Sequence, residues 1–144
     1  ADPTAKRVPN VRVMPMIYTS LTGLSRHVIK ELLAARVRTV EIRSPNNFIA
    51  IHDHQPGDRL FVTDSSAMDV VPGTTGLIAT IKALQIITHR TIQSGEYYYE
   101  ERESQAARLQ LQLVGVGRVR RITSIEPGTP LTLDVDEVRY CGAR

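Results

Sequence analysis

Short stretches in which apolar and polar residues alternate, separated by turn-forming dipeptides, constrain the fold of this chain most strongly. In residues 37–43, Val40 and Ile42 alternate with polar side chains, and in residues 107–113 leucines alternate with polar side chains in the same way. Side chains of a β-strand point to opposite faces in turn, whereas a helix repeats about every 3.6 residues. The alternation therefore predicts β-strands that bury one face and expose the other.

Further strands are expected where apolar runs lie between turn residues such as Pro56-Gly57 and Pro72-Gly73. The expected strands are 11–18, 37–43, 48–52, 59–63, 77–84 with 86–87 as a continuation, 107–113, 116–122 and 131–135. Many short strands at regular spacing are typical of a barrel or a sandwich and not of an array in which strands and helices alternate.

One segment follows a helical period instead. Leu24, Val28, Ile29, Leu32 and Leu33 recur at spacings that place them on one face of a helix. Hydroxyl side chains that suit an N-cap precede them. This predicts one main helix over residues 23–35, and the expected fold class is α+β, mostly β.

Length and composition limit the class of protein. The chain has 144 residues, 42% of them hydrophobic, which suits one ordinary domain. We expect a flexible tail at 1–10 and a single domain at 11–144. No apolar run nears the roughly 20 residues that span a bilayer and no apolar leader is present, so we expect a cytoplasmic protein without a membrane partner. Cys141 is the only cysteine, which excludes an internal disulfide and a Cys-cluster zinc site. We expect no metal and no cofactor.

Arginines lie in clusters in a chain whose formal net charge is +3. Strand alternation places Arg118 and Arg120 on one face. Together with Arg43 and Arg108 they form the predicted nucleic-acid-binding surface, because guanidinium groups bind phosphates well. The glycines near Arg118 are not followed by the Lys-Ser/Thr of a P-loop. An alternative stays open: these arginines lie along a solvated edge strand and discourage aggregation.

Two other segments carry groups that could bind a ligand. The segment from Tyr97 to Glu103 is rich in tyrosine and glutamate. Tyrosines can stack on unpaired bases, but the glutamates repel phosphates, so contact with a protein partner or simple packing remains open. His52 and His54 flank Asp53 at the spacing of a two-ligand metal clamp if a strand runs through them, yet no third ligand is indicated and a polar turn is the alternative.

Three short motifs, in this order, resemble those of ASCH domains in the PUA-like superfamily. They are Arg38-Thr39-Val40-Glu41-Ile42-Arg43, then Pro56-Gly57-Asp58, then Gly76-Leu77-Ile78-Ala79. This resemblance covers about residues 20–90. The longer stretch from Leu21 to Ile122 resembles an uncharacterised archaeal family of unknown function. The resemblance implies a small PUA-like β-barrel with a cleft, RNA binding and, in some members, chemistry on RNA or modified nucleosides.

Three functions follow as hypotheses. In the first, an RNA-binding module holds phosphates with Arg43, Arg118 and Arg120. Thr39 and Glu41, which share one strand face with Arg43, contact a base or sugar in a cleft. In the second, a hydrolase acts on RNA or a modified nucleoside with Glu41 as general base, supported by Thr39 and Arg38. Hydrolases proposed in the resembled family have lysine at the position of Arg38, and arginine does not shed its proton, so lysine-dependent chemistry is in doubt. In the third, the chain docks a protein partner through the segment from Tyr97 to Glu103.

Overall fold

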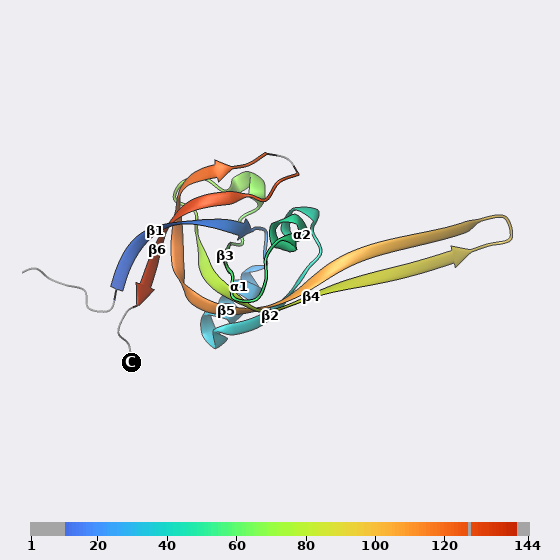
Figure 1. Ribbon diagram of the computed structural model, residues 1–144, viewed down its shortest axis with the longest axis horizontal. Coiled ribbons are helices and arrows are strands. Elements are labelled where there is room, and N and C mark those ends of the chain that lie inside the picture. Colours follow the sequence, from blue (N-terminus) through green and yellow to red (C-terminus); the bar gives the residue numbers. More distant parts are fainter. Residues whose placement is uncertain (1–10, 127, 141–144) are drawn as a thin grey trace, which may run out of the picture.

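The computed structural model describes residues 11–126 and 128–140, and its elements follow the chain from β1 to β6 (Figure 1). The expected tail at 1–10 and Cys141 lie outside the described residues. The strands are β1 (Val11–Leu21), β2 (Val37–Ile42), β3 (Arg59–Val62), β4 (Thr75–Ser94), β5 (Tyr99–Ser124) and β6 (Thr132–Tyr140). The helices are α1 (Arg26–Ala35), α2 (Pro45–His52) and the short 3-10 helix η1 (Ala67–Asp69). The fold is mostly β, as the sequence predicts, with two α-helices where one main helix was expected.

The strands form a sheet that closes into a ring. Five strands pair in the cyclic order β5, β4, β3, β1, β6 and back to β5. The pairing of β1 with β3 is parallel, and the others in the ring are antiparallel. One edge of β5 is shared by two partners, β2 along residues 107–112 and β6 along residues 116–124. Strand β2 is therefore attached to the side of the ring.

Two hydrophobic clusters hold this arrangement together. The first joins both helices to the sheet and includes Leu32 of α1, Ile51 of α2 and Leu109 of β5. The second includes Phe61 and Val135 and joins strands from opposite parts of the ring. All five side chains are fully buried, and each such burial contributes roughly 1.5–3 kcal/mol.

The expected helix at 23–35 is confirmed, with a later start. Ser25 is the N-cap, and its hydroxyl accepts a hydrogen bond from the backbone N–H of Val28 at 3.2 Å. At the other end Arg36 adopts the left-handed conformation, with φ of 68°, and its N–H bonds the carbonyl of Leu32. The cap hydroxyl lies inside the range expected to be helical, which explains the difference of three residues.

The expected strand at 48–52 is wrong, because this segment is the second half of α2. Ser44 caps the helix by accepting from the N–H of Asn47 at 3.2 Å, and Pro45 occupies the first turn. A proline there costs nothing, since the first N–H groups of a helix have no intrahelical partner. The buried Asn47 side chain accepts from the N–H of Thr22 at 2.9 Å and donates to its carbonyl at 2.7 Å, which ties α2 to the end of β1.

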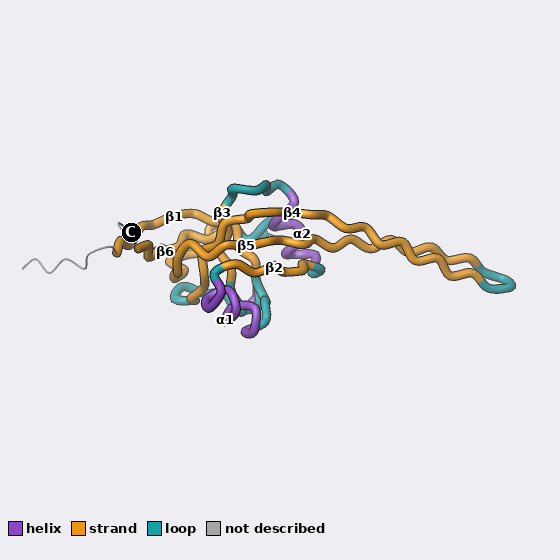
Figure 2. Tube along the Cα trace, turned by 90° about the horizontal axis from the view of Figure 1, so that it is seen from below, coloured by secondary structure: helices purple, strands orange, loops and turns teal. Residues whose placement is uncertain are grey.

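Strands β4 and β5 are much longer than expected. The separate strands predicted at 107–113 and 116–122 belong to β5, and residues 77–94 run through β4. The register shifts between Ile81 and Ala83 and again between Ile78 and Ala79, where β-bulges interrupt the ladder. Beyond them the two strands leave the body as a two-stranded ribbon, plainly seen in Figures 1 and 2. Residues 88–105 of this ribbon are called the arm below.

No helix in the described part of the chain is long and apolar enough to cross a membrane.

Candidate functional site

The register of β2 against β5 assembles part of the predicted site on the outer side of the sheet. Glu41 lies opposite Arg108, and Thr39 lies opposite Gln110. On its other side Arg108 pairs with Gln85 of β4. We call this surface the polar face, and its members are Thr39, Glu41, Arg43, Gln85, Arg108, Gln110 and Gln112, all of them exposed. Four of the predicted site residues therefore meet here.

The polar face carries two guanidinium groups for one carboxylate. Arg43 donates to Glu41 at 2.9 Å, with side chains that are 71% and 40% exposed. An exposed ion pair of this kind contributes at most about 1 kcal/mol. Arg108 forms no ion pair within the described part of the chain. Its guanidinium group is therefore open to an anion from solution, beside a row of amide side chains that can both donate and accept hydrogen bonds.

The structure does not bring Arg38 together with Thr39 and Glu41. Arg38 lies on the same face of β2 as the buried Val40, two residues away. Its Nε lies 2.5 Å from a carboxylate oxygen of Glu31 on α1. A second nitrogen of Arg38 donates to the backbone carbonyl of Thr39 at 3.0 Å. The guanidinium group thus fixes α1 against β2, and the three residues expected to act together in catalysis lie on two sides of the strand.

Arg118 and Arg120 lie at another place on β5. They follow Arg108 by ten and twelve residues, which corresponds to roughly 33–40 Å along an extended strand. Arg118 pairs in register with Asp136 of β6, and Nε of Arg120 lies 3.8 Å from the carboxylate of Asp136. The neighbouring Arg121 likewise contacts Asp134 at 3.3 Å. The four arginines predicted to form one surface therefore divide between the polar face and the edge next to β6.

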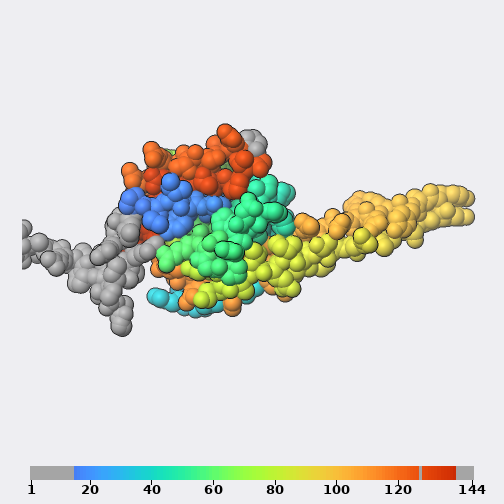
Figure 3. All heavy atoms as spheres, viewed as in Figure 1, coloured from blue at the N-terminus to red at the C-terminus, as the bar shows by residue number. Residues whose placement is uncertain are grey.

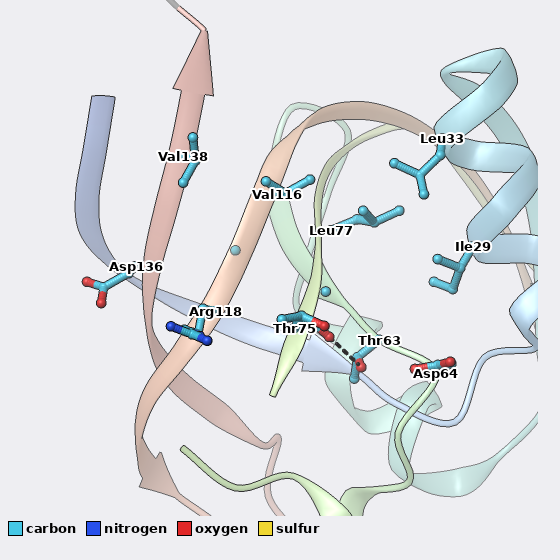
Figure 4. Close-up of a pocket in the computed structure, with 12 residues that line it drawn as sticks. Ile29, Leu33, Thr63, Asp64, Thr75, Leu77, Val116, Arg118, Asp136 and Val138 are labelled. Carbon is cyan, nitrogen blue, oxygen red and sulfur yellow. Dashed lines mark hydrogen bonds between the residues drawn. The ribbon is translucent and has the colours of Figure 1, made fainter. Parts of the chain in front are cut away.

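A groove that the sequence did not predict lies between α1 and the ring (Figure 4). Its volume is about 630 Å³, within the range of ligand pockets. Side chains of α1 face those of β4 and β5 across it in Figure 4. We call it the apolar groove, and its lining residues are Ile29, Leu33, Leu77, Val116 and Val138, with Thr63, Asp64, Thr75, Arg118 and Asp136 as a polar rim and Gly76 and Gly117 between them.

Two positions in the lining of the groove are glycines because the inside of the ring directly behind them is tightly packed. Gly76 and Gly117 pair with each other across β4 and β5. A Cβ atom on Gly76 would lie 2.6 Å from the carbonyl oxygen of Val62, and one on Gly117 would lie 2.6 Å from Cγ1 of Val135. No side chain therefore fits on the inner side at either position.

The rim of the groove is polar and mostly paired. The Thr63 hydroxyl donates to the carbonyl of Thr75 at 3.1 Å, as drawn in Figure 4. Asp64 lies 3.6 Å from Nε of Arg26, and Asp136 contacts Arg120 as described above. Arg118 is the exception, since it forms no ion pair with any described residue. Alternation singled out Arg118 in the sequence, but nothing there indicated that α1 would cover the sheet beside it.

The remaining predicted ligand groups lie elsewhere. His52 ends α2 instead of sitting in a strand, and its Nδ1 lies 3.3 Å from Asp53. His54 follows the helix and lines a separate surface pocket beside β1. The described residues contain no group of three histidine, cysteine, aspartate or glutamate side chains that could hold a metal ion. Tyr97 and Tyr98 occupy the turn of the arm, with Glu103 in β5.

Comparison with known proteins gives a family without an assigned function. A model of the family described as "Protein of unknown function (DUF473)" matches residues 16–133. The chain is similar to the uncharacterised protein MJ0105 of Methanocaldococcus jannaschii, with 24% identity over 105 residues, 73% of this chain and 66% of that relative. The match thus spans just under two thirds of the relative's length. No solved structure matches the chain. Because the family model covers most of the sequence, the chain belongs to this family of unknown function.

Proposed function

We propose that the chain is an RNA-binding module of the PUA-like type that holds single-stranded RNA on the polar face. The observation that carries the proposal is the position of Arg108, an exposed guanidinium group without an ionic partner among the described residues. It lies between Glu41 on β2 and Gln85 on β4. In this proposal Arg108 and Arg43 hold phosphate oxygens, which accept well from the planar guanidinium fork.

The amide and hydroxyl groups beside these arginines suit contacts with the RNA bases and sugars. Gln85, Gln110 and Gln112 each offer a donor and an acceptor, and Thr39 adds a hydroxyl group. Exposed single strands display base edges and 2′-hydroxyl groups that such side chains can reach. Because the side chains of the polar face are all exposed, they suit an extended strand better than a small buried substrate.

Binding is a better account of this surface than catalysis. Glu41 is half-exposed and bonded to Arg43. Arg38, expected to assist it, is held by Glu31 on the other side of β2. The side chain of Glu41 is 40% exposed to solvent, whereas general-base chemistry in a closed site requires that water be excluded.

The test is a titration of fluorescently labelled single-stranded RNA by anisotropy, with two matched double variants. Replacing Arg43 and Arg108 by alanine is expected to weaken binding about a hundredfold or more, since two charged contacts worth roughly 1.5 kcal/mol or more each are lost. Replacing Arg120 and Arg121, which are held by Asp136 and Asp134, removes the same charge and serves as the control. Equal losses in both variants contradict the proposal, because they indicate a diffuse electrostatic attraction.

A further inference from the structure

The arm is a long two-stranded ribbon that extends away from the rest of the described chain (Figures 1 and 2). Its strands pair from Thr88 with Gln105 to Ser94 with Tyr99, six steps or roughly 20 Å of extended chain. Every side chain in residues 88–105 is exposed except that of Glu100, which is half-buried. An isolated two-stranded hairpin is at best marginally stable in water. We therefore expect the arm to be stabilised by contact with another molecule.

The turn of the arm presents aromatic side chains to solvent. Tyr97 is 91% exposed, Tyr98 is 61% exposed and Tyr99 is 66% exposed. The ring of Tyr98 covers Gly95, where a Cβ atom would lie 2.3 Å from Cε1 of that ring. Tyr97 thus protrudes furthest. Tyrosines of this kind are typical anchors of protein interfaces, since they bury a large area and lose little side-chain entropy.

The apolar groove is the complementary feature of the body. Its walls leave large apolar side chains in solvent, with Leu33 at 47% and Val116 at 39% exposure. Aromatic side chains favour such a site, where the ring packs against aliphatic groups and the hydroxyl reaches the polar rim. Thr63, Thr75 and Arg118 supply that rim.

The charges of the two features are opposite. The arm has four glutamates and two arginines, a net charge of 2 − 4 = −2, whereas the whole chain has +3. Arg90 contacts Glu101, and Arg102 contacts Glu100, at 2.6 and 2.7 Å. Glu96 and Glu103 form no ion pair with any described residue.

The groove has the opposite balance. Around it lie three cations and two carboxylates: Arg118 on the rim, and Arg26 and Arg120 in contact with Asp64 and Asp136, which gives a net charge of 3 − 2 = +1. Opposite charges on two such surfaces steer them together and suppress other pairings. The negative charge of the arm equally disfavours a nucleic acid as its partner.

We infer that the arm of one copy docks its tyrosine turn into the apolar groove of a second copy. The arm of the second copy docks in the same way into the groove of the first. The arm leads away from the body in Figures 1, 2 and 3, so its turn does not reach its own groove. A reciprocal exchange repeats the same contact about a twofold axis and closes the assembly at two chains. The inference does not depend on RNA binding, because none of the polar face takes part.

The oligomeric state of the purified chain, measured by light scattering during gel filtration, tests this inference. Wild type is expected to be a dimer. Replacing Tyr97 and Tyr98 by serine is expected to weaken the dimer about tenfold or more. Leu33→Glu should do the same by placing a charge in the groove, and both changes lie at exposed positions that folding tolerates. The controls are His89→Ser on the arm and Ala34→Glu on α1, exposed positions outside the proposed contact.

Mixing the two disrupted variants gives the decisive result. The tyrosine variant retains an intact groove, and Leu33→Glu retains an intact arm, so an equimolar mixture should form dimers that neither variant forms alone. A monomeric wild type overturns the inference. It is also overturned by a dimer that both variants leave intact, or by a mixture that stays monomeric while circular dichroism shows both variants folded.

Discussion

The close approach of strands inside the ring makes Gly117→Ala a sharp test of the fold. The new Cβ atom would lie 2.6 Å from Cγ1 of Val135, a fully buried side chain on β6. Overpacking of this kind costs roughly 1–3 kcal/mol of unfolding free energy. Val135→Ala alone removes two methyl groups and leaves a cavity, at a cost of about 2 kcal/mol.

The double variant separates this collision from a general intolerance of change. With the Val135 methyl groups gone, the Cβ atom at position 117 fills the space that they leave. The double variant should then cost about 2 kcal/mol, and not the sum of about 4 kcal/mol that independent sites would give. Gly76→Ala is the control, because its Cβ atom would meet Phe61 and the Val62 carbonyl, which Val135→Ala does not relieve.

Urea unfolding followed by far-UV circular dichroism measures these free energies for each single and double variant. The expected coupling between positions 117 and 135 is about 2 kcal/mol, with additive effects for 76 and 135. Additive losses at 117 and 135 would refute the proposed closure of the ring, since the two residues would then not be in contact.

Three further predictions concern parts of the fold that position the candidate surfaces. Ser44→Ala removes the N-cap of α2 and should lower the unfolding free energy by about 1 kcal/mol in the same urea assay, whereas Ser44→Asp should not. Tyr18→Phe removes the hydroxyl that donates to the fully buried Glu137, at a cost of roughly 1–3 kcal/mol; an unchanged stability contradicts this pairing. Replacing residues 88–105 by Asn-Gly should leave the melting temperature of the monomeric body within about 4 °C, since the side chains of the arm are exposed apart from that of the half-buried Glu100; a much larger fall would show that the arm supports the ring.

The sequence predicted the elements whose signals are local. Alternation around Val40 and Ile42 gave β2, and the apolar face that contains Leu32 gave α1. Helix α2 was missed although Ser44 and Pro45 form a strong helix start, because a short apolar run after a Ser-Pro pair also suits a turn followed by a strand. Intrinsic patterns of five or six residues do not decide between these two structures.

The remaining differences depend on contacts between distant residues. The arm was not expected as a ribbon, since both of its faces are exposed to solvent and its sequence lacks the alternation of apolar and polar residues that predicts a strand. The polar face was partly predictable, because Thr39, Glu41 and Arg43 share a strand face. Pairing of Arg120 with Asp136 depends on the register of β5 against β6, which a single sequence does not determine. The apolar groove depends on where α1 packs.

The salt dependence of RNA affinity in wild type and in Arg108→Ala tests the central proposal most directly. Anisotropy titrations of single-stranded RNA over a series of salt concentrations give the slope of log affinity against log salt. The proposal predicts measurable binding that weakens with salt, and a slope that falls by about 0.7 when the one phosphate contact of Arg108 is lost. Absence of RNA binding at low salt, or an Arg108→Ala variant with the affinity and slope of wild type, would contradict it.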